Sequence, residues 1–198
     1  MVKALPIGVS DFAKVREQDS YYVDKTMLIA EWLKAQTEVT LITRPRRFGK
    51  TLNMTMLREF FDITKDSEAL FAGLAVQSTA YRQEMNQWPV IFLSFKDCKG
   101  TYEGAMTCVY KTLLQAFKPV LASNFSTIEK KMLDKTLEVL TELDFAQKSV
   151  VQDALYTLSQ LLYQQYGKKV IILIDEYDTP LISAYEQGYY DEVHFFFG

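Results

Sequence analysis

The sequence predicts an α/β fold in which a mostly parallel sheet lies between two layers of helices. Short apolar runs typical of buried strands alternate along the chain with stretches whose apolar residues recur at helical spacing. This alternation is typical of parallel strands joined by crossover helices. Two of the apolar runs are followed by polar motifs, Gly49-Lys50-Thr51 after the first and Asp175-Glu176 after the last. Together these observations favour a three-layer sandwich.

The predicted strands are three apolar runs, at residues 39–43, 90–95 and 170–174. The predicted helices cover residues 28–33, 52–61, 106–117, 128–140 and 154–162, with a short helical piece after Leu181. Asp24 or Thr26 is expected to cap the first helix, and Gly167 to close the fifth. Residues 71–88 are expected to be irregular or short-helical.

Length, composition and charge limit the classes to which this protein can belong. The chain has 198 residues, of which 48% are hydrophobic, and this predicts one domain spanning residues 1–198 with an ordinary core. A formal net charge of −3 gives no global attraction to nucleic acid. Cys98 and Cys108 lack a second pair or a histidine cluster, which favours two reduced thiols in a cytoplasmic protein. We see no signal peptide and no apolar window of about 18 residues for a membrane span.

The segment around Gly49-Lys50-Thr51 matches the end of a phosphate-binding loop. In such loops, backbone N–H groups surround a phosphate, the lysine neutralises its charge and the hydroxyl residue binds Mg²⁺. The usual first glycine is replaced by Arg44, so the loop must begin differently. The predicted nucleotide-binding residues are Arg44, Pro45, Arg46, Arg47, Phe48, Gly49, Lys50, Thr51 and Leu52.

Three arginines, Arg44, Arg46 and Arg47, flank this loop. Their guanidinium groups could pair with phosphate oxygens or with carboxylates of the same fold, and a local nucleic-acid patch is the alternative use.

The acidic pair at residues 175 and 176 suits two separate roles in phosphoryl transfer. Asp175 is the predicted Mg²⁺ ligand together with Thr51, and Glu176 is the predicted catalytic residue that orients or deprotonates the attacking water. The structural alternative is an exposed cap between strand and loop, and Asp178 fits a turn residue. A cation that stabilises the transition state would have to be Arg46, Arg47 or a partner's group, because no arginine follows Arg82.

Several segments resemble the AAA-ATPase-like family of bacterial proteins, which often carry a C-terminal PD-(D/E)XK nuclease-like domain. The most specific is Arg44-Pro45-Arg46-Arg47-Phe48-Gly49-Lys50-Thr51, in which the missing glycine looks like a family trait. The others are Leu5-Pro6-Ile7-Gly8 with Asp11-Phe12, Tyr22-Val23-Asp24-Lys25-Thr26, Val90-Ile91-Phe92-Leu93-Ser94-Phe95 and Leu173-Ile174-Asp175-Glu176-Tyr177-Asp178-Thr179-Pro180-Leu181.

The resemblance implies a P-loop NTPase-like fold, with ATP and Mg²⁺ as cofactors. It also implies a further strand that carries a polar sensor residue. In the sheet this strand would lie between the first and last predicted strands, but in the sequence it would follow both, beyond Gly198. Residues 193–198 do not look like the family's continuation, which suggests a truncated or frame-shifted product with a fold incomplete at its C-terminus. Apolar faces of residues 39–42 and 170–174 would then be exposed, and a protein partner or self-association would complete the sheet.

Three functions follow from these features. The first is ATP binding with Mg²⁺-dependent hydrolysis. The alternative is a nucleotide-binding switch or interaction module with little hydrolysis, and the third is nucleic-acid association through Arg44, Arg46 and Arg47. The adenine pocket is not located by any motif, although residues 21–26 are a candidate segment. His194, beside three phenylalanines, is expected to pack rather than to catalyse.

Overall fold

The computed structural model describes residues 3–43, 45 and 48–197, and it divides into two compact units. The first unit covers residues 1–90 and the second covers residues 91–198. Each unit is described here by itself.

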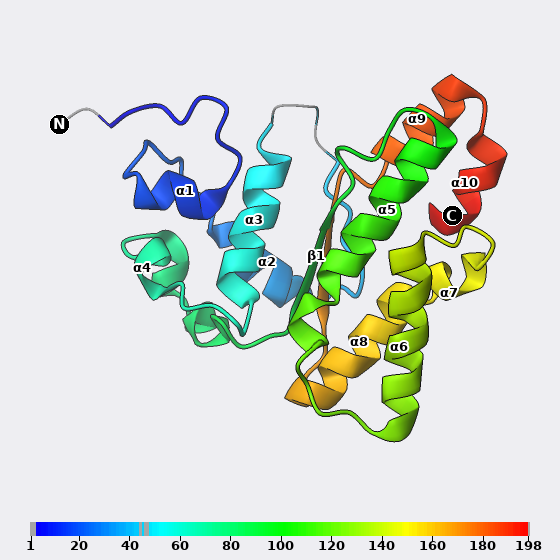
Figure 1. The fold of residues 1–198 in the computed structure, drawn as a ribbon. Coiled ribbons are helices and arrows are strands. Elements are labelled where there is room, and N and C mark those ends of the chain that lie inside the picture. Colours follow the sequence, from blue (N-terminus) through cyan, green and yellow to red (C-terminus); the bar gives the residue numbers. More distant parts are fainter. Residues whose placement is uncertain (1–2, 44, 46–47, 198) are drawn as a thin grey trace. The chain divides into compact units, whose positions relative to one another are not determined.

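The first unit is helical (Figure 1). Its α-helices are α1 (Phe12–Glu17), α2 (Met27–Ala35), α3 (Lys50–Phe61) and α4 (Glu68–Phe71), followed by the 3-10 helices η1 (Ala75–Ser78) and η2 (Ala80–Glu84). Helix α1 packs against α3 and α4, and α2 packs against η1 and η2. The rings of Phe12, Phe60 and Phe71 are fully buried, and Phe71 packs against both others, with centroids 4.9 Å apart for Phe12 and 5.3 Å apart for Phe60. This aromatic cluster fixes α3 in the unit.

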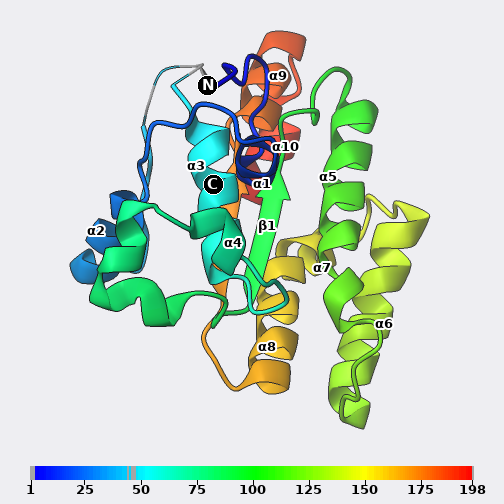
Figure 2. The same ribbon diagram turned by 90° about the vertical axis from the view of Figure 1, so that its left-hand side faces the viewer.

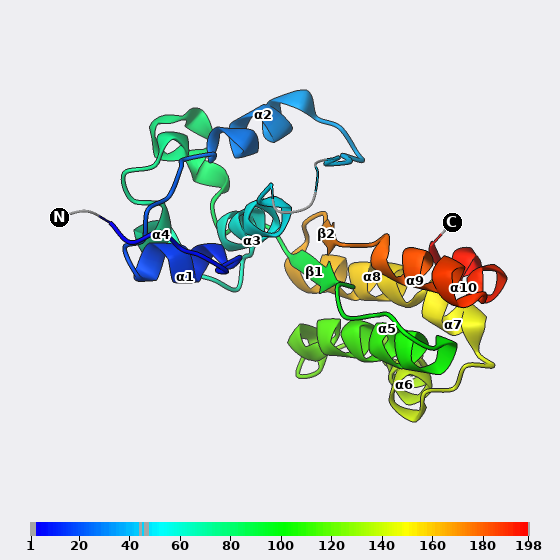
Figure 3. The ribbon, with the colours of Figure 1, turned by 90° about the horizontal axis from the view of Figure 1, so that it is seen from above.

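The second unit contains a small parallel sheet and most of the longer helices. Strand β1 (Val90–Ser94) begins at the last residue of the first unit and pairs with β2 (Ile171–Asp175). The helices are α5 (Tyr102–Ala116), η3 (Lys118–Val120), α6 (Thr127–Glu142), α7 (Lys148–Gln152), α8 (Ala154–Tyr166), α9 (Thr179–Gln187) and α10 (Tyr190–Phe197). Helices α5 and α6 run side by side, as Figures 1 and 3 show.

One apolar core joins the strands and helices of the second unit. Ile91 and Leu93 of β1 are buried with side chains from α5, α6, α8, α9 and α10. Figure 2 shows β1 with α5 and α8 beside it. The backbone N–H of Phe95 donates to the carbonyl of Asp175 at 3.0 Å, so the carboxyl ends of β1 and β2 lie next to each other.

The α/β class is confirmed in this coarser form, but the predicted first strand is wrong. Residues 39–43 have no regular secondary structure in the described chain. Val39 is 87% exposed and Leu41 is 63% exposed. These apolar side chains therefore lack the packing against neighbouring strands and helices that a central strand requires. On β2, Ile172 and Ile174 are exposed as well, as expected for residues 170–174.

The predicted helices are confirmed, each within a few residues of its predicted ends. Thr26 occupies the N-cap position of α2 but makes no capping hydrogen bond, and Asp24 instead accepts hydrogen bonds from Thr26. Gly167 closes α8 in the left-handed conformation, as predicted. Helices α1, α4, α7 and α10 were not predicted; α1, α4 and α7 are 6, 4 and 5 residues long, too short for a clear apolar repeat.

The prediction of two reduced thiols is wrong in the structure. Cys98, in the loop after β1, and Cys108, in α5, form a disulfide, with Cα atoms 5.0 Å apart. A separation of 10 residues places one cysteine before the helix and the other two turns inside it, which spacing alone did not indicate.

Candidate functional site

The start of α3 carries the phosphate-loop motif. Gly49 is the N-cap residue with a φ of 75°, in the left-handed region where a side chain would be strained. Lys50 and Thr51 are the first two residues of the helix, and the N–H of Asn53 donates to the carbonyl of Gly49 at 3.0 Å. The N–H groups of a first helical turn that have no partner within the helix favour an anion. The local backbone is therefore suited to phosphate.

The other predicted loop residues differ in how far the structure describes them. Lys50, Thr51 and Leu52 are half-buried, whereas Phe48 is 57% exposed. The N–H of Phe48 donates to the carbonyl of Pro45 at 3.4 Å. Arg44, Arg46 and Arg47 lie outside the described residues, so their roles remain predictions.

A cavity lies beside this helix start, within the first unit. Its volume is about 390 Å³, which is in the range of roughly 300–1,000 Å³ typical of small-molecule sites. One part of its wall comes from the segment before α2 and the other from the start of α3. The lining residues are Pro6, Tyr21, Tyr22, Val23, Lys25, Phe48, Gly49, Leu52 and Asn53.

Hydrogen bonds to Asp24 hold the first of these walls in place. The Asp24 carboxylate accepts from the N–H and hydroxyl of Thr26, at 2.8 and 2.7 Å, and from the N–H of Ala75 at 2.7 Å. Partial burial would raise the pKa of Asp24, but these hydrogen bonds and the charge of Arg16 hold that pKa below its usual value. Asp24 thus joins the segment before α2 to the start of η1.

Tyr22 ties the same segment to α3. Its hydroxyl donates to the sulfur of Met56 at 3.3 Å, and its ring packs edge-on against Phe12 with centroids 5.4 Å apart. Burial raises the pKa of the Tyr22 phenol. Tyr22 thus links the segment before α2 to α3 and to the aromatic core.

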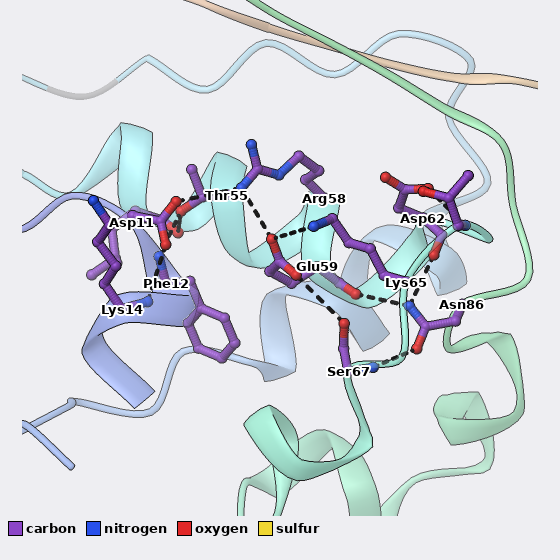
Figure 4. Close-up of polar contacts among 12 residues, drawn as sticks. Asp11, Phe12, Lys14, Thr55, Arg58, Glu59, Asp62, Lys65, Ser67 and Asn86 are labelled. Atoms are coloured by element: carbon purple, nitrogen blue, oxygen red, sulfur yellow. Dashed lines mark hydrogen bonds and ion pairs between the residues drawn. The ribbon is translucent and has the colours of Figure 1, made fainter. Parts of the chain in front are cut away.

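A buried polar network fixes the other end of α3 (Figure 4). Glu59 is 4% exposed, and its carboxylate pairs with Arg58 at 3.0 Å and with Lys65 at 3.1 Å. The Ser67 hydroxyl reaches the same carboxylate at 3.5 Å. The amide of Asn86 donates to the carbonyls of Glu59 and Asp62. These contacts anchor α3 against the loop that follows it, which keeps Gly49 at a defined position in the unit.

The acidic pair lies in the second unit, at the end of β2. Asp175 is 3% exposed and is the last residue of the strand. Glu176 has a φ of 51°, which is uncommon for a residue with a side chain. Its exposed carboxylate accepts from the hydroxyl of Thr179 at 3.3 Å. Asp178 lies in the turn that leads into α9, as predicted.

The loop after β1 is hydrogen-bonded to α9 and to the residue that precedes α10. The N–H of Gly100 donates to the hydroxyl of Ser183 at 2.8 Å, and the Tyr189 hydroxyl donates to the carbonyl of Gly100 at 2.7 Å. The disulfide holds this same loop to α5. The loop after β1 is therefore joined both to the segment that follows β2 and to α5.

The structure thus places the predicted site residues in two groups. Gly49, Lys50 and Thr51 share the start of α3 in the first unit, and Asp175 and Glu176 share the end of β2 in the second. Sequence reasoning missed Asn53, which is 6% exposed and lines the cavity. A polar residue two positions after Thr51, on the buried side of an amphipathic helix, was the available signal.

The predicted magnesium ligands, Thr51 and Asp175, each offer an oxygen atom. Within the part of the chain that the structure describes, no group of three or more His, Cys, Asp or Glu side chains could hold a metal ion. Magnesium commonly binds through one or two protein oxygens, with phosphates and water completing its coordination. A hydroxyl such as that of Thr51 and a strand-end carboxylate such as Asp175 are ligands of that kind.

Comparison with known proteins defines the class. The model of the AAA-ATPase_like family, described as "Predicted AAA-ATPase", matches residues 6–197. The chain belongs to this family, which suggests ATP binding. It is also similar to an "Uncharacterized protein in vnfD 5'region" of Azotobacter chroococcum mcd 1, with 31% identity over 186 residues.

The match with the Azotobacter protein covers 91% of this chain but 30% of that protein. No solved structure matches the chain. Among the described residues, none of the helices has the length and apolar character needed to span a membrane.

Proposed function

We propose that this chain binds ATP at the start of α3 and hydrolyses it with Mg²⁺. The observation that carries the proposal is the left-handed turn at Gly49, which leads directly into a helix whose first residues are Lys50 and Thr51. Backbone N–H groups and the Lys50 ammonium group would bind the phosphates. Family membership over residues 6–197 supports ATP as the nucleotide.

Hydrolysis is assigned to the acidic pair. Thr51 and Asp175 would hold magnesium, which neutralises phosphate charge when it is bound. Glu176 directly follows Asp175 in the sequence and is exposed. Its carboxylate would orient or deprotonate the attacking water. In this proposal residues 1–198 form a P-loop NTPase-like domain of the three-layer type, and a protein partner or second copy supplies further strands.

A second candidate is a nucleotide-binding switch that hydrolyses slowly. One observation favours it: no arginine follows Arg82 in the chain, so the second unit contains no guanidinium group to stabilise a transition state. Arg46, Arg47 or a partner's arginine would have to supply that cation.

Association with nucleic acid through Arg44, Arg46 and Arg47 is a separate possibility. It would make the affinity for DNA fall steeply as the salt concentration rises.

Calorimetric titration with ATP and Mg²⁺ tests the proposal. Lys50→Ala is expected to weaken ATP binding at least about tenfold, because a charge-assisted phosphate contact is lost. Lys131→Ala, which removes an exposed lysine of α6, is the matched control and should leave affinity unchanged. Equal affinities of the wild type and Lys50→Ala would contradict ATP binding at this helix.

Steady-state turnover separates the two candidates. Glu176→Gln should retain ATP binding and lose at least about a hundredfold in turnover if Glu176 is the catalytic carboxylate. A wild-type chain that binds ATP with turnover no faster than the Glu176→Gln variant would instead be a switch.

A further inference from the structure

Strand β2 has one edge that no strand of the described chain covers. The sheet has two strands in the order β1-β2, so β2 pairs with β1 along one of its edges. Figure 3 shows the two strands beside each other. Along its other edge β2 pairs with no strand from residues 3–43, 45 and 48–197. Such an edge presents backbone N–H and C=O groups with which a further strand can pair.

The pairing with β1 determines which residues face the open edge. The N–H of Phe95 donates to the carbonyl of Asp175 at 3.0 Å, so Asp175 directs its backbone groups toward β1. Along a strand, successive residues direct their N–H and C=O groups alternately to the two sides. Ile172 and Ile174 therefore direct their backbone groups to the open edge.

The side chains along this edge are apolar and partly exposed. Ile172 is 43% exposed and Ile174 is 37% exposed. Residues 170–174 include no charged residue and no proline, which are the residues that commonly prevent an edge strand from pairing with another chain. The composition of β2 thus favours pairing over solvation.

The charges that flank β2 select the partner. Lys168 and Lys169 come before the apolar run, and Asp175 and Glu176 follow it. Two copies of this segment paired antiparallel place the basic end of one beside the acidic end of the other, which is favourable, whereas parallel pairing would place like charges together. The segment is therefore complementary to a second copy of itself.

One register satisfies both the backbone and the side chains. If Ile172 lies opposite Ile172 of the second copy, the two residues can exchange both N–H···O=C bonds, as a hydrogen-bonded antiparallel pair does. Val170 then lies opposite Ile174 of the second copy. In the same register Lys168 comes opposite Glu176 of the second copy, and Glu176 is exposed.

We propose that two copies of this chain associate through β2, antiparallel about a two-fold axis at Ile172, to form a four-stranded sheet. The contact uses the same surface on both copies, so it closes with two chains. It specifies the partner that supplies further strands in the proposed function and rests on that function only for this role. The pairing itself requires no nucleotide.

Sedimentation equilibrium without nucleotide tests the association. The wild type is expected to reach twice the mass of one chain as its concentration rises. Ile172→Lys should weaken the dimer at least about a hundredfold, because two lysines would face each other at the axis. Ile128→Lys, which changes a 73% exposed isoleucine of α6, is the matched control and should stay within about twofold of the wild type. A wild type that remains monomeric at about 100 μM, or a dimer equally sensitive to both changes, would overturn the proposal.

A pair of charge reversals tests the antiparallel register. Lys168→Glu and Glu176→Lys should each weaken the dimer about tenfold, because like charges then meet at both ends of the paired strands. An equal mixture of the two variants should recover the wild-type affinity within about threefold, since each end then joins a lysine to a glutamate. Circular dichroism verifies that each variant is folded. A mixture that associates no better than either variant alone, or assemblies larger than two chains, would overturn the register.

The variant Lys50→Ala separates this proposal from the proposed function. It should form the dimer as the wild type does and lose ATP binding. A dimer whose wild-type chains do not bind ATP would contradict the proposed function alone. A wild-type chain that binds ATP and stays monomeric would overturn the dimer alone.

Discussion

Among single residues, Glu59 is a charge whose burial is compensated by neighbours on both sides. Arg58 and Lys65 supply the cations, and Ser67 supplies a hydroxyl. Burying a carboxylate is unfavourable unless such partners are present. The network thus stabilises α3 only while all of its members are present. Removing the Glu59 carboxylate leaves the Arg58 and Lys65 cations without their shared partner.

We expect Glu59→Ala to lower the free energy of unfolding by about 2–4 kcal/mol, because it breaks a buried ion-pair network. Urea denaturation followed by tryptophan fluorescence measures this. Glu68→Ala is the control, since Glu68 pairs with Arg82 on the surface, where both side chains are more than half exposed. That loss should stay below about 1 kcal/mol. Similar losses in the two variants would show that the Glu59 network contributes no more than a surface pair.

At the scale of elements, residues 39–43 show how far local sequence determines a strand. Their β-branched and apolar side chains predict β-structure, but strand formation also requires a neighbouring strand with which to pair. Residues 171–175 have such a neighbour in β1 and form β2. The helices were more predictable, because their hydrogen bonds are local and their apolar repeat is visible in the sequence.

Hydrogen exchange tests this difference between elements. Amides at residues 39–43 should exchange at least about a hundredfold faster than those at residues 57–61, which lie in the buried last turns of α3. Mass spectrometry of peptic fragments resolves the two segments. Comparable protection would mean that residues 39–43 do form a hydrogen-bonded strand in solution.

The candidate site could be predicted only in part for the same reason. Gly49-Lys50-Thr51 and Asp175-Glu176 are contiguous motifs, so their chemistry is visible in the sequence. The cavity is not, because it joins Tyr21 and Asn53, which are 32 positions apart, through contacts such as those of Asp24 with Ala75. Such a wall depends on tertiary packing that no local pattern encodes.

At the scale of the whole molecule, the two units have separate cores and different spectroscopic signals. Both tryptophans, Trp32 and Trp88, lie in the first unit, where the Trp32 ring packs against Phe61. Tryptophan fluorescence therefore reports unfolding of the first unit alone. Far-ultraviolet circular dichroism reports the helices of both units.

A matched pair of core variants uses this asymmetry. Leu158→Ala removes a fully buried side chain of α8, and Leu57→Ala removes a 5% exposed one of α3. Each should cost its own unit about 2–5 kcal/mol. We expect Leu57→Ala to lower the urea midpoint of the fluorescence transition. Leu158→Ala should leave that midpoint unchanged and lower the urea midpoint of the second unit's part of the circular dichroism transition. Equal fluorescence shifts would show that the units unfold together.

The bond between Cys98 and Cys108 has a practical consequence for the chain. These are the two cysteines in the sequence, so the folded protein presents no free thiol while the bond is intact. Cysteines introduced on the surface would then be the only free thiols available to a maleimide dye or a nitroxide spin label. One label in each unit would then give the distance between the units, with and without nucleotide, directly in solution.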